Sequence, residues 1–229
     1  MNIIDYIKNI PLFEGLLPEH YKDLTSIAVK RVFKKGERIF SEGDEGNGFY
    51  VVNSGRVKIF KLSPEGKEQI LHLFGPGEPF GEVPVFSGED FPASAEALED
   101  SQILFFPRKG FVELIGKNPL LALNMLATLS RRLRTFTVLI ENLSLKEVPG
   151  RLAAYLLYLS EQKNAGNNLM LDISKNQLAS LLGTIPETLS RILTRMDKEG
   201  FIKSVGSRNI KILDRDGLYE LVGGERRLA

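Results

Sequence analysis

The chain has 229 residues and an almost balanced charge, with 30 Lys and Arg side chains against 29 Asp and Glu, so its net charge is +1. This balance excludes a general electrostatic attraction to nucleic acid or anionic lipid, and any such binding must come from a local basic patch. The sequence has no cysteine, which excludes disulfides, thiolate metal sites, cysteine nucleophiles and cysteine-ligated iron–sulfur clusters. The length suits one large domain or two smaller ones.

The start of the sequence does not resemble a secretory signal peptide. Asp5, Lys8 and Glu14 interrupt its apolar residues, and it has no small-residue cleavage site. No stretch approaches the roughly 20 apolar residues that a membrane-spanning helix needs. We therefore expect a soluble, cytoplasmic protein with no membrane partner.

Two short helices are predicted first, over residues 3–10 and 18–29. From about residue 31 to residue 108, ten glycines separate short apolar stretches, for example 49–52, 57–61, 70–74 and 103–106. Short apolar stretches with turn residues between them are typical of an all-β roll, barrel or sandwich.

A long helix is predicted after Pro119, because no glycine or proline follows until Pro149. Its apolar residues recur at steps of three and four and form a narrow heptad seam. The seam consists of Leu126, Leu129, Leu133, Phe136, Ile140 and Leu143. So narrow a seam favours packing against one partner helix, which predicts a homodimer. The alternative, that the seam covers the β-strands, stays open.

A third unit begins near Glu147, with an amphipathic helix predicted over 151–163, a loop over 164–168 and a brief strand over 170–173. After these elements, two capping boxes each predict a helix start, one formed by Ser174 with Gln177 and the other by Thr184 with Glu187. Gly183 suits the left-handed end of the first of these helices. Two short helices joined by a glycine turn form a helix-turn-helix, whose second helix can enter the major groove of DNA.

The second of these helices separates its residues by face. We expect one stripe to be buried, formed by Leu189, Ile192, Leu193 and Met196. The opposite face carries Glu187, Ser190 and Arg191, which can read base edges, since Arg pairs with guanine and Glu accepts from cytosine. The alternative, that Glu187 only completes a capping box and the arginines are a solvated face, stays open.

Residues 201–213 are predicted to form a β-hairpin wing with its tip at 206–209. Between Glu187 and Lys211 the sequence has six basic residues against three acidic ones, and this local excess supplies the basic patch. The candidates for contacts to the DNA backbone are Lys175, Asn176, Thr184, Arg195 and Arg208.

Three stretches of the β-rich region carry a family resemblance: Gly36-Glu-Arg-Ile-Phe-Ser-Glu-Gly43, Phe49-Tyr-Val-Val-Asn-Ser-Gly-Arg-Val57 and Gly77-Glu-Pro-Phe-Gly-Glu-Val83. With the seam helix and Pro186-Glu-Thr-Leu-Ser-Arg191, they resemble the family of the cAMP receptor protein and the fumarate and nitrate reduction regulator. The resemblance implies an α+β fold in three parts. These are a cyclic-nucleotide-binding-like β-roll that senses an effector over 1–118, a dimerisation helix and hinge over 119–146, and a winged helix-turn-helix over 147–229. It also implies a dimeric transcription regulator and not an enzyme, in which a ligand in the roll reorients the DNA-binding domains.

The resemblance also bears on the effector. Gly81 and Glu82 resemble the turn of cyclic-nucleotide sites, where the backbone and the carboxylate hold phosphate and ribose. Where the family pattern has Arg followed by Ser or Thr, this chain has Pro92 and Ala93, and a proline cannot neutralise a phosphate. We therefore expect an effector other than cAMP.

The chain is most similar to the branch of the family that regulates nitrogen-oxide respiration and responds to nitrosative stress, on residues 58–70, 137–146, 186–191 and 212–215. In that branch the signal is nitric oxide, thought to be read through haem. A haem cofactor would need an axial donor, for which His72 is the candidate and His20 the other histidine of the chain. A non-haem organic effector or a cyclic nucleotide is the alternative.

For the recognition helix, the resemblance implies a palindromic operator with half-sites like TTGAC or TTGAT, whose centres lie about one helical turn apart. RNA polymerase would be a further partner if the protein is an activator. Two other functional classes are alternatives to a transcription regulator. A cyclic-nucleotide-binding regulatory subunit would lack the helix-turn-helix, and a metal enzyme of the double-stranded β-helix type would need a His and Glu cluster that two separate histidines do not supply.

Overall fold

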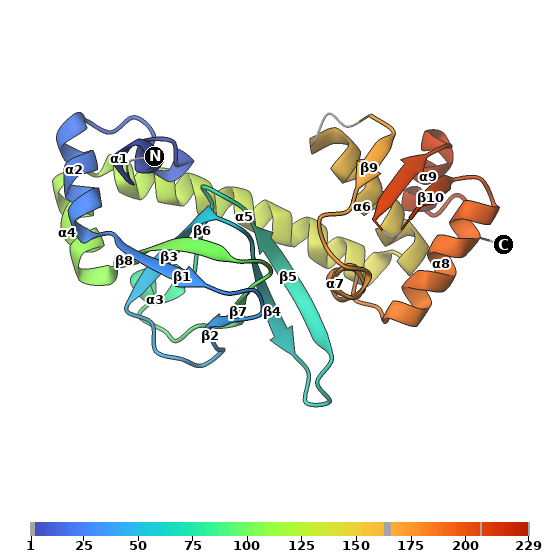
Figure 1. The fold of residues 1–229 in the computed structure, drawn as a ribbon, viewed down its shortest axis with the longest axis horizontal. Coiled ribbons are helices and arrows are strands. Elements are labelled where there is room, and N and C mark those ends of the chain that lie inside the picture. Colours follow the sequence, from blue (N-terminus) through green and yellow to red (C-terminus); the bar gives the residue numbers. More distant parts are fainter. Residues whose placement is uncertain (1–2, 163–165, 207, 229) are drawn as a thin grey trace. The chain divides into compact units, whose positions relative to one another are not determined.

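The computed structural model describes residues 3–162, 166–206 and 208–228, and it divides the chain into two compact units, Met1–Arg134 and Thr135–Ala229 (Figure 1). Among the described residues, no helix is both long and apolar enough to cross a membrane. The long helix α5 (Leu120–Leu145) contains the boundary between the two units, and each unit is described by itself below.

The first unit is built on two four-stranded antiparallel sheets, with strand orders β1-β8-β3-β6 and β2-β7-β4-β5. The predicted apolar stretches all lie within strands, which confirms the β-roll. The strands are β1 (Val29–Phe33), β2 (Arg38–Phe40), β3 (Gly48–Ser54), β4 (Val57–Leu62), β5 (Glu68–Phe74), β6 (Pro79–Phe80), β7 (Ser94–Ala97) and β8 (Ser101–Pro107).

Strand β3 shows why the roll also needs helices. Its side chains alternate between two faces, as in any strand. Tyr50 and Val52 belong to the aromatic core inside the roll, whereas Phe49 and Val51 belong to a second core that the helices complete. Because β3 is buried on both faces, its sequence is a continuous apolar run and not an alternating one.

The helices of the first unit are α1 (Ile3–Lys8), the 3-10 turn η1 (Pro11–Phe13), α2 (Pro18–Ile27), α3 (Val83–Phe86), α4 (Arg108–Lys117) and α5. Helices α1, α2 and α4 lie together on one side of the strands (Figure 1). The sequence did not predict α3 or α4, because α3 has four residues and α4 contains two glycines, which disfavour helix. Gly110 has a packing reason, since a Cβ atom there would lie 3.0 Å from Ile27 on α2.

The second unit contains α6 (Val148–Gln162), β9 (Asn168–Met170), α7 (Lys175–Leu181), α8 (Pro186–Lys198), β10 (Ile202–Val205), β11 (Asn209–Ile212) and α9 (Arg215–Gly223). The three strands form one sheet in the order β10-β11-β9, and the β10–β11 hairpin confirms the predicted wing, of which residue 207 lies outside the described residues. Residues 163–165, the end of the predicted helix and the start of the predicted loop, also lie outside them.

The strand predicted over 170–173 is wrong in position. The observed β9 is Asn168–Met170, which pairs with β11. Leu171 still donates its N–H to the carbonyl oxygen of Arg208, at 2.8 Å, but the chain then leaves the sheet for the cap of α7. Helix α9 was not predicted.

Candidate nucleic-acid interface and effector pocket

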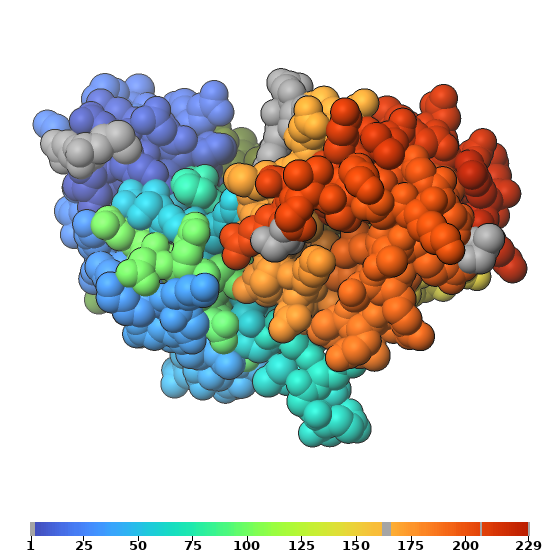
Figure 2. Space-filling model, turned by 45° about the vertical axis from the view of Figure 1, so that its right-hand side comes forward, coloured from blue at the N-terminus to red at the C-terminus, as the bar shows by residue number. Residues whose placement is uncertain are grey.

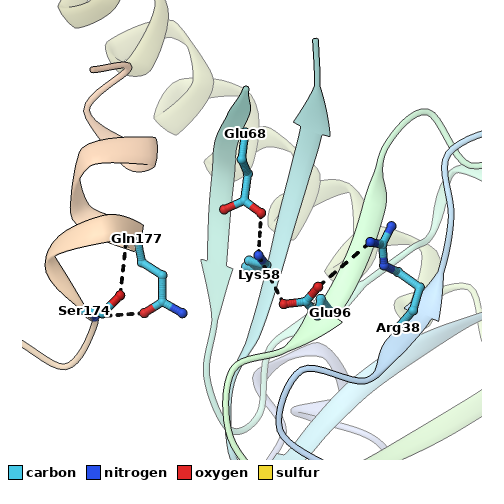
Figure 3. Close-up of polar contacts among 6 residues, drawn as sticks. All are labelled: Arg38, Lys58, Glu68, Glu96, Ser174 and Gln177. Atoms are coloured by element: carbon cyan, nitrogen blue, oxygen red, sulfur yellow. Dashed lines mark hydrogen bonds and ion pairs between the residues drawn. The ribbon is translucent and has the colours of Figure 1, made fainter. Parts of the chain in front are cut away.

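Helix α7 begins with the predicted capping box. The Gln177 N–H donates to Oγ of Ser174 at 3.2 Å, and the Ser174 N–H donates to Oε1 of Gln177 at 2.8 Å (Figure 3). These bonds satisfy backbone donors that a helix start otherwise leaves open. The exposed first turn carries Lys175 and Asn176, whose contact to the DNA backbone stays a prediction.

The second capping box is wrong. Helix α8 begins at Pro186, and its N-cap residue Ile185 makes no side-chain capping bond. Thr184 instead closes the preceding helix: its N–H donates to the carbonyl oxygen of Ala179 at 2.9 Å, beyond Gly183 with its positive φ of 66°. This ending confirms the predicted role of Gly183. Thr184 therefore does not cap α8, although its predicted contact to DNA is untested.

Glu187 lies in the first turn of α8 and is not part of a capping box. Its carboxylate closes no capping box, it is exposed, and it forms no ion pair within the described part of the chain. The negative charge of Glu187 in the first turn interacts favourably with the positive end of the helix dipole. The interpretation of Glu187 as nothing more than a capping residue is therefore wrong, and its side chain is available to a partner.

The two faces of α8 are as predicted. Its buried stripe is Leu189, Ile192, Leu193 and Met196, and its exposed residues include Glu187, Ser190, Arg191 and Arg195. Thr188, which was not predicted as a site residue, accepts a hydrogen bond from Nη2 of Arg191 at 3.2 Å and so orients its guanidinium. The orange atoms of α7 and α8 lie on the molecular surface (Figure 2).

On the wing, Lys203, one of the six basic residues between Glu187 and Lys211, is already neutralised. Nζ of Lys203 lies 2.9 Å from Asp197 on α8, whose other carboxylate oxygen accepts the N–H of Ser204 at 2.7 Å. These two contacts, the backbone bond first, hold the pKa of Asp197 below its usual value. Arg208 is exposed and forms no ion pair within the described ranges, so its cation remains available.

In the β-roll, Gly81 occupies a position that only glycine fits. Its φ is 69°, and a Cβ atom would lie 3.1 to 3.2 Å from rings of Phe40, Phe91 and Tyr50. The residue after it, Glu82, is 8% exposed. The tight turn therefore holds the Glu82 carboxylate against the aromatic core.

The partner of Glu82 is Arg132 on α5, which was not predicted as a site residue. Nη1 of Arg132 donates to Oε1 of Glu82, and Nη2 donates to the carbonyl oxygen of Pro79. The guanidinium carbon also lies 4.9 Å from the ring centre of Phe74. A sequence signal existed: Arg132 follows the buried Met125 by seven residues, so both lie on one face of the helix.

The second oxygen of the Glu82 carboxylate differs from most buried polar atoms, because it lacks a hydrogen bond to the described part of the chain. Oε2 of Glu82 is buried and has no hydrogen-bond partner among the described residues. A buried acceptor without a donor costs about 1–3 kcal/mol. This oxygen is therefore a ready acceptor for a ligand.

At the position of the missing arginine, Pro92 is exposed and Ala93 is buried. A cation does reach this turn, since Nζ of Lys61 donates to the carbonyl oxygen of Pro92 at 3.1 Å. The same Nζ lies 2.5 Å from a carboxylate oxygen of Glu42, so its charge is balanced. Phe91, the neighbour of Pro92, packs over Gly81, which brings the two predicted parts of the pocket together.

Comparisons with known proteins agree with this geometry. Residues 30–118 match the model of the cyclic nucleotide-binding domain, and residues 150–221 match the Crp-like helix-turn-helix domain. The chain belongs to the Crp/Fnr family of transcription regulators. As a member, it is a DNA-binding regulator with an effector-binding domain.

Known Crp/Fnr proteins resemble it over nearly their full length. The chain is 37% identical to the cyclic AMP receptor protein of Thermus thermophilus, over 95% of this chain and 99% of that protein. It is 31% identical to the fumarate and nitrate reduction regulatory protein of Escherichia coli, over 93% of this chain and 87% of the relative. The fold is also similar to the solved structure of FixK2 from Bradyrhizobium japonicum, with a TM-score of 0.75 and 27% identity. The match covers 85% of this chain and 97% of the FixK2 chain.

The two histidines of this Crp/Fnr regulator lie on separate elements, His72 on strand β5 and His20 on helix α2. His72 on β5 stands 4.4 Å from Phe74 between ring centres, and burial, with the positive charge of Arg132, lowers its pKa to about 4. His20 on α2 has its Nδ1 at 2.9 Å from Nδ2 of Asn118, between α4 and α5. No group of three or more metal-binding side chains occurs within residues 3–162, 166–206 and 208–228.

The predicted seam lies on α5 with three of its members strongly exposed. Leu126, Leu133 and Ile140 are 60%, 68% and 64% exposed, at intervals of seven residues. Leu129 instead packs partly against the helix-covered core of the first unit, and Phe136 is half-buried. The alternative that the seam covers the roll therefore applies to Leu129 and not to the three exposed residues.

A charge network around the buried Lys58, on the β2-β7-β4-β5 sheet, was also not predicted. Nζ of Lys58 lies 2.5 Å from Glu68 and 3.1 Å from Glu96, and Arg38 lies 3.9 Å from Glu96 (Figure 3). Two cations and two carboxylates balance one another, so the network needs no external ion. Cross-strand register, which pairs Glu96 with both Lys58 and Arg38, explains the two contacts of Glu96.

Proposed function

We propose that this Crp/Fnr regulator binds, as a homodimer, a palindromic operator with half-sites like TTGAC or TTGAT. The observation that carries the proposal is the exposed face of α8, where Glu187, Ser190 and Arg191 stand above a fully buried stripe. Neither Glu187 nor Arg191 forms an ion pair within the described residues, so both are available for base edges.

Selection of binding sites from random duplex DNA, read by sequencing, tests this proposal. We expect inverted repeats whose half-site centres lie about one helical turn apart. Single half-sites or sequences without symmetry would contradict the dimeric operator. A contact to RNA polymerase belongs to the proposal only if an operator upstream of a promoter raises transcription in vitro.

For the effector, we infer a small organic molecule that donates hydrogen bonds and carries no phosphate. Oε2 of Glu82 needs a donor, and Arg132 is already held by Glu82 and Pro79. Glu78 lies near the same guanidinium, and burial raises its pKa. Two carboxylates around one guanidinium disfavour an anion, and the charge of Lys61 at Pro92 is already balanced.

A relative bears the name cyclic AMP receptor protein, so cAMP is the direct control. Calorimetric titration of cAMP should show no binding at the β-roll, so Glu82→Gln should leave the isotherm of the full chain unchanged. Replacing Pro92 by Arg and Ala93 by Ser should introduce or strengthen cAMP binding. Tight binding of cAMP by the unchanged chain that Glu82→Gln weakens would overturn the inferred effector class and leave the operator proposal intact.

Haem-based sensing of nitrogen oxides is the second candidate. It rests on His72, one of the two histidines of the chain, because a neutral imidazole is a common axial donor for haem iron. Haem would supply an iron atom that binds nitric oxide. An absorption spectrum of the protein mixed with haem tests it: a Soret band that the His72→Ala variant changes supports the candidate, and the spectrum of free haem rules it out.

A further inference from the structure

A hollow in the second unit lies between the start of α6 and the flank of the DNA-reading helix α8. Its volume is about 530 Å³, which falls within the range of pockets that hold small-molecule ligands. Residues of both helices line it, and all of them belong to the same compact unit. The hollow is therefore a feature of the DNA-binding domain itself.

The charges that line this hollow are mostly positive. Arg151, Arg191 and Arg195 stand against one carboxylate, that of Glu147. Within the described part of the chain, none of the three guanidiniums forms an ion pair with an acidic side chain. The N-terminal end of α6 adds the positive end of a helix dipole. The hollow is therefore suited to an anion.

Arg151 is the residue of this group with unmet bonding capacity. Its Nη1 donates to the carbonyl oxygen of Leu143 at 3.3 Å, which holds the side chain in place. Its Nε is buried without a hydrogen-bond partner among the described residues, and burial lowers its pKa below the usual value. A nearby negative charge would offset the cost of burying this cation.

The remaining lining consists of the apolar Val148, Pro149 and Ile192 and of Thr188. An inorganic ion would leave these side chains without contacts. Guanidinium planes also stack on flat rings, which adds a second mode of contact to their charge. The combination calls for a ligand with an anionic head and a flat or apolar body.

We propose that this hollow binds a nucleotide-sized organic anion, whose phosphate contacts Arg151 and whose ring lies against Val148, Pro149 and Ile192. Because Arg191 and Arg195 line the same hollow, the bound anion competes with operator DNA for these side chains. The competition rests on the proposed role of Arg191 in reading DNA, whereas the binding itself does not. The anion thus regulates the DNA-binding domain without the β-roll.

The test is calorimetric titration of AMP into the full chain without DNA, beside adenosine and inorganic phosphate as its two halves. We expect AMP to bind at least about tenfold more tightly than either half. Arg151→Gln should weaken AMP binding by about tenfold or more, while Lys198→Gln, an exposed position of α8 outside the hollow, should leave it unchanged. If thermal melting shows that Arg151→Gln does not fold, Val148→Glu is the second variant, because it places a carboxylate in the same hollow and repels the anion.

Absence of AMP binding, or equal binding by the unchanged chain and both hollow variants, would overturn the proposal. Weaker operator binding by Arg151→Gln without any AMP binding would assign the hollow to a DNA phosphate, which also overturns it. In fluorescence anisotropy, AMP should weaken operator binding by the unchanged chain and not by Arg151→Gln. If the unchanged chain binds no operator, the proposed DNA reading fails, and calorimetry still decides the hollow.

Discussion

Under the proposed function, Arg191 is the residue on which sequence-specific reading should depend most. It is exposed, and Thr188 orients its guanidinium. Replacing Arg191 by Ala should weaken binding to a matched operator by about 1–3 kcal/mol and relax the preference at one guanine. Fluorescence anisotropy with matched and singly mismatched duplexes measures both effects.

Lys198→Ala is the matched control for this prediction, since Lys198 is an exposed cation in the last turn of the same helix. It should weaken binding to all duplexes alike or not at all. If Arg191→Ala also weakens matched and mismatched duplexes equally, Arg191 contacts the backbone and does not read a base.

His72 should make the stability of the protein depend on pH. Burial, then the charge of Arg132, lowers its folded pKa from 6.5 to about 4. Between these values the unfolded chain binds a proton that the folded chain does not. The free energy of unfolding therefore falls as the pH drops through this window, by up to about 3 kcal/mol.

Chemical denaturation from pH 7 to pH 4 measures this dependence, with His72→Gln as the reference because glutamine does not titrate. Between pH 7 and pH 4, we expect the free energy of unfolding of the unchanged chain to fall more than that of His72→Gln. Parallel pH profiles would show that His72 does not titrate in this way.

At the scale of elements, the two helix starts of the helix-turn-helix should respond differently to loss of a hydroxyl. Ser174→Ala removes the cap of α7 and should destabilise it by about 0.5–2 kcal/mol. Thr184→Ala removes no cap, since α8 begins after Ile185, and should cost less than about 0.5 kcal/mol. Amide hydrogen exchange at Gln177 and thermal melting separate the two variants, and equal effects would restore Thr184 as a cap.

The elements predicted best were those with a strong local signal. The stripe of α8, the capping box of α7 and the apolar strands of the roll each follow from spacing within a few residues. The start of α8 was predicted wrongly because two helices competed for Thr184, and closure of α7 took its backbone N–H. A sequence pattern does not show which of two neighbouring elements uses a shared residue.

At the scale of the whole molecule, the homodimer should depend on the exposed seam of α5. Leu133→Glu places a charge in the predicted interface, while its 68% exposure means that the fold of one chain loses little. We expect sedimentation velocity to show monomers and operator affinity to fall. Ser130→Glu, an exposed position between seam residues, is the control and should remain dimeric.

A chain that is monomeric without the substitution, with and without operator DNA, would contradict both the seam and the palindromic operator. A dimer that Leu133→Glu leaves intact would place the interface elsewhere and leave DNA reading by α8 untouched.

The sequence alone determined the strands of the roll and the two faces of α8, because burial follows the local periodicity of apolar residues, and its family resemblance implied the fold class and the order of the parts. Tertiary structure decided which charges remain available. Arg132 meets Glu82 across 50 residues, Lys61 reaches Pro92 across 31, and Lys203 meets Asp197 where the wing folds back on α8. It also decided that Arg151, far from α8 in sequence, lines a hollow beside it. Ion pairs and cavities depend on distances in space between segments that lie apart in the chain, and residue spacing does not contain those distances.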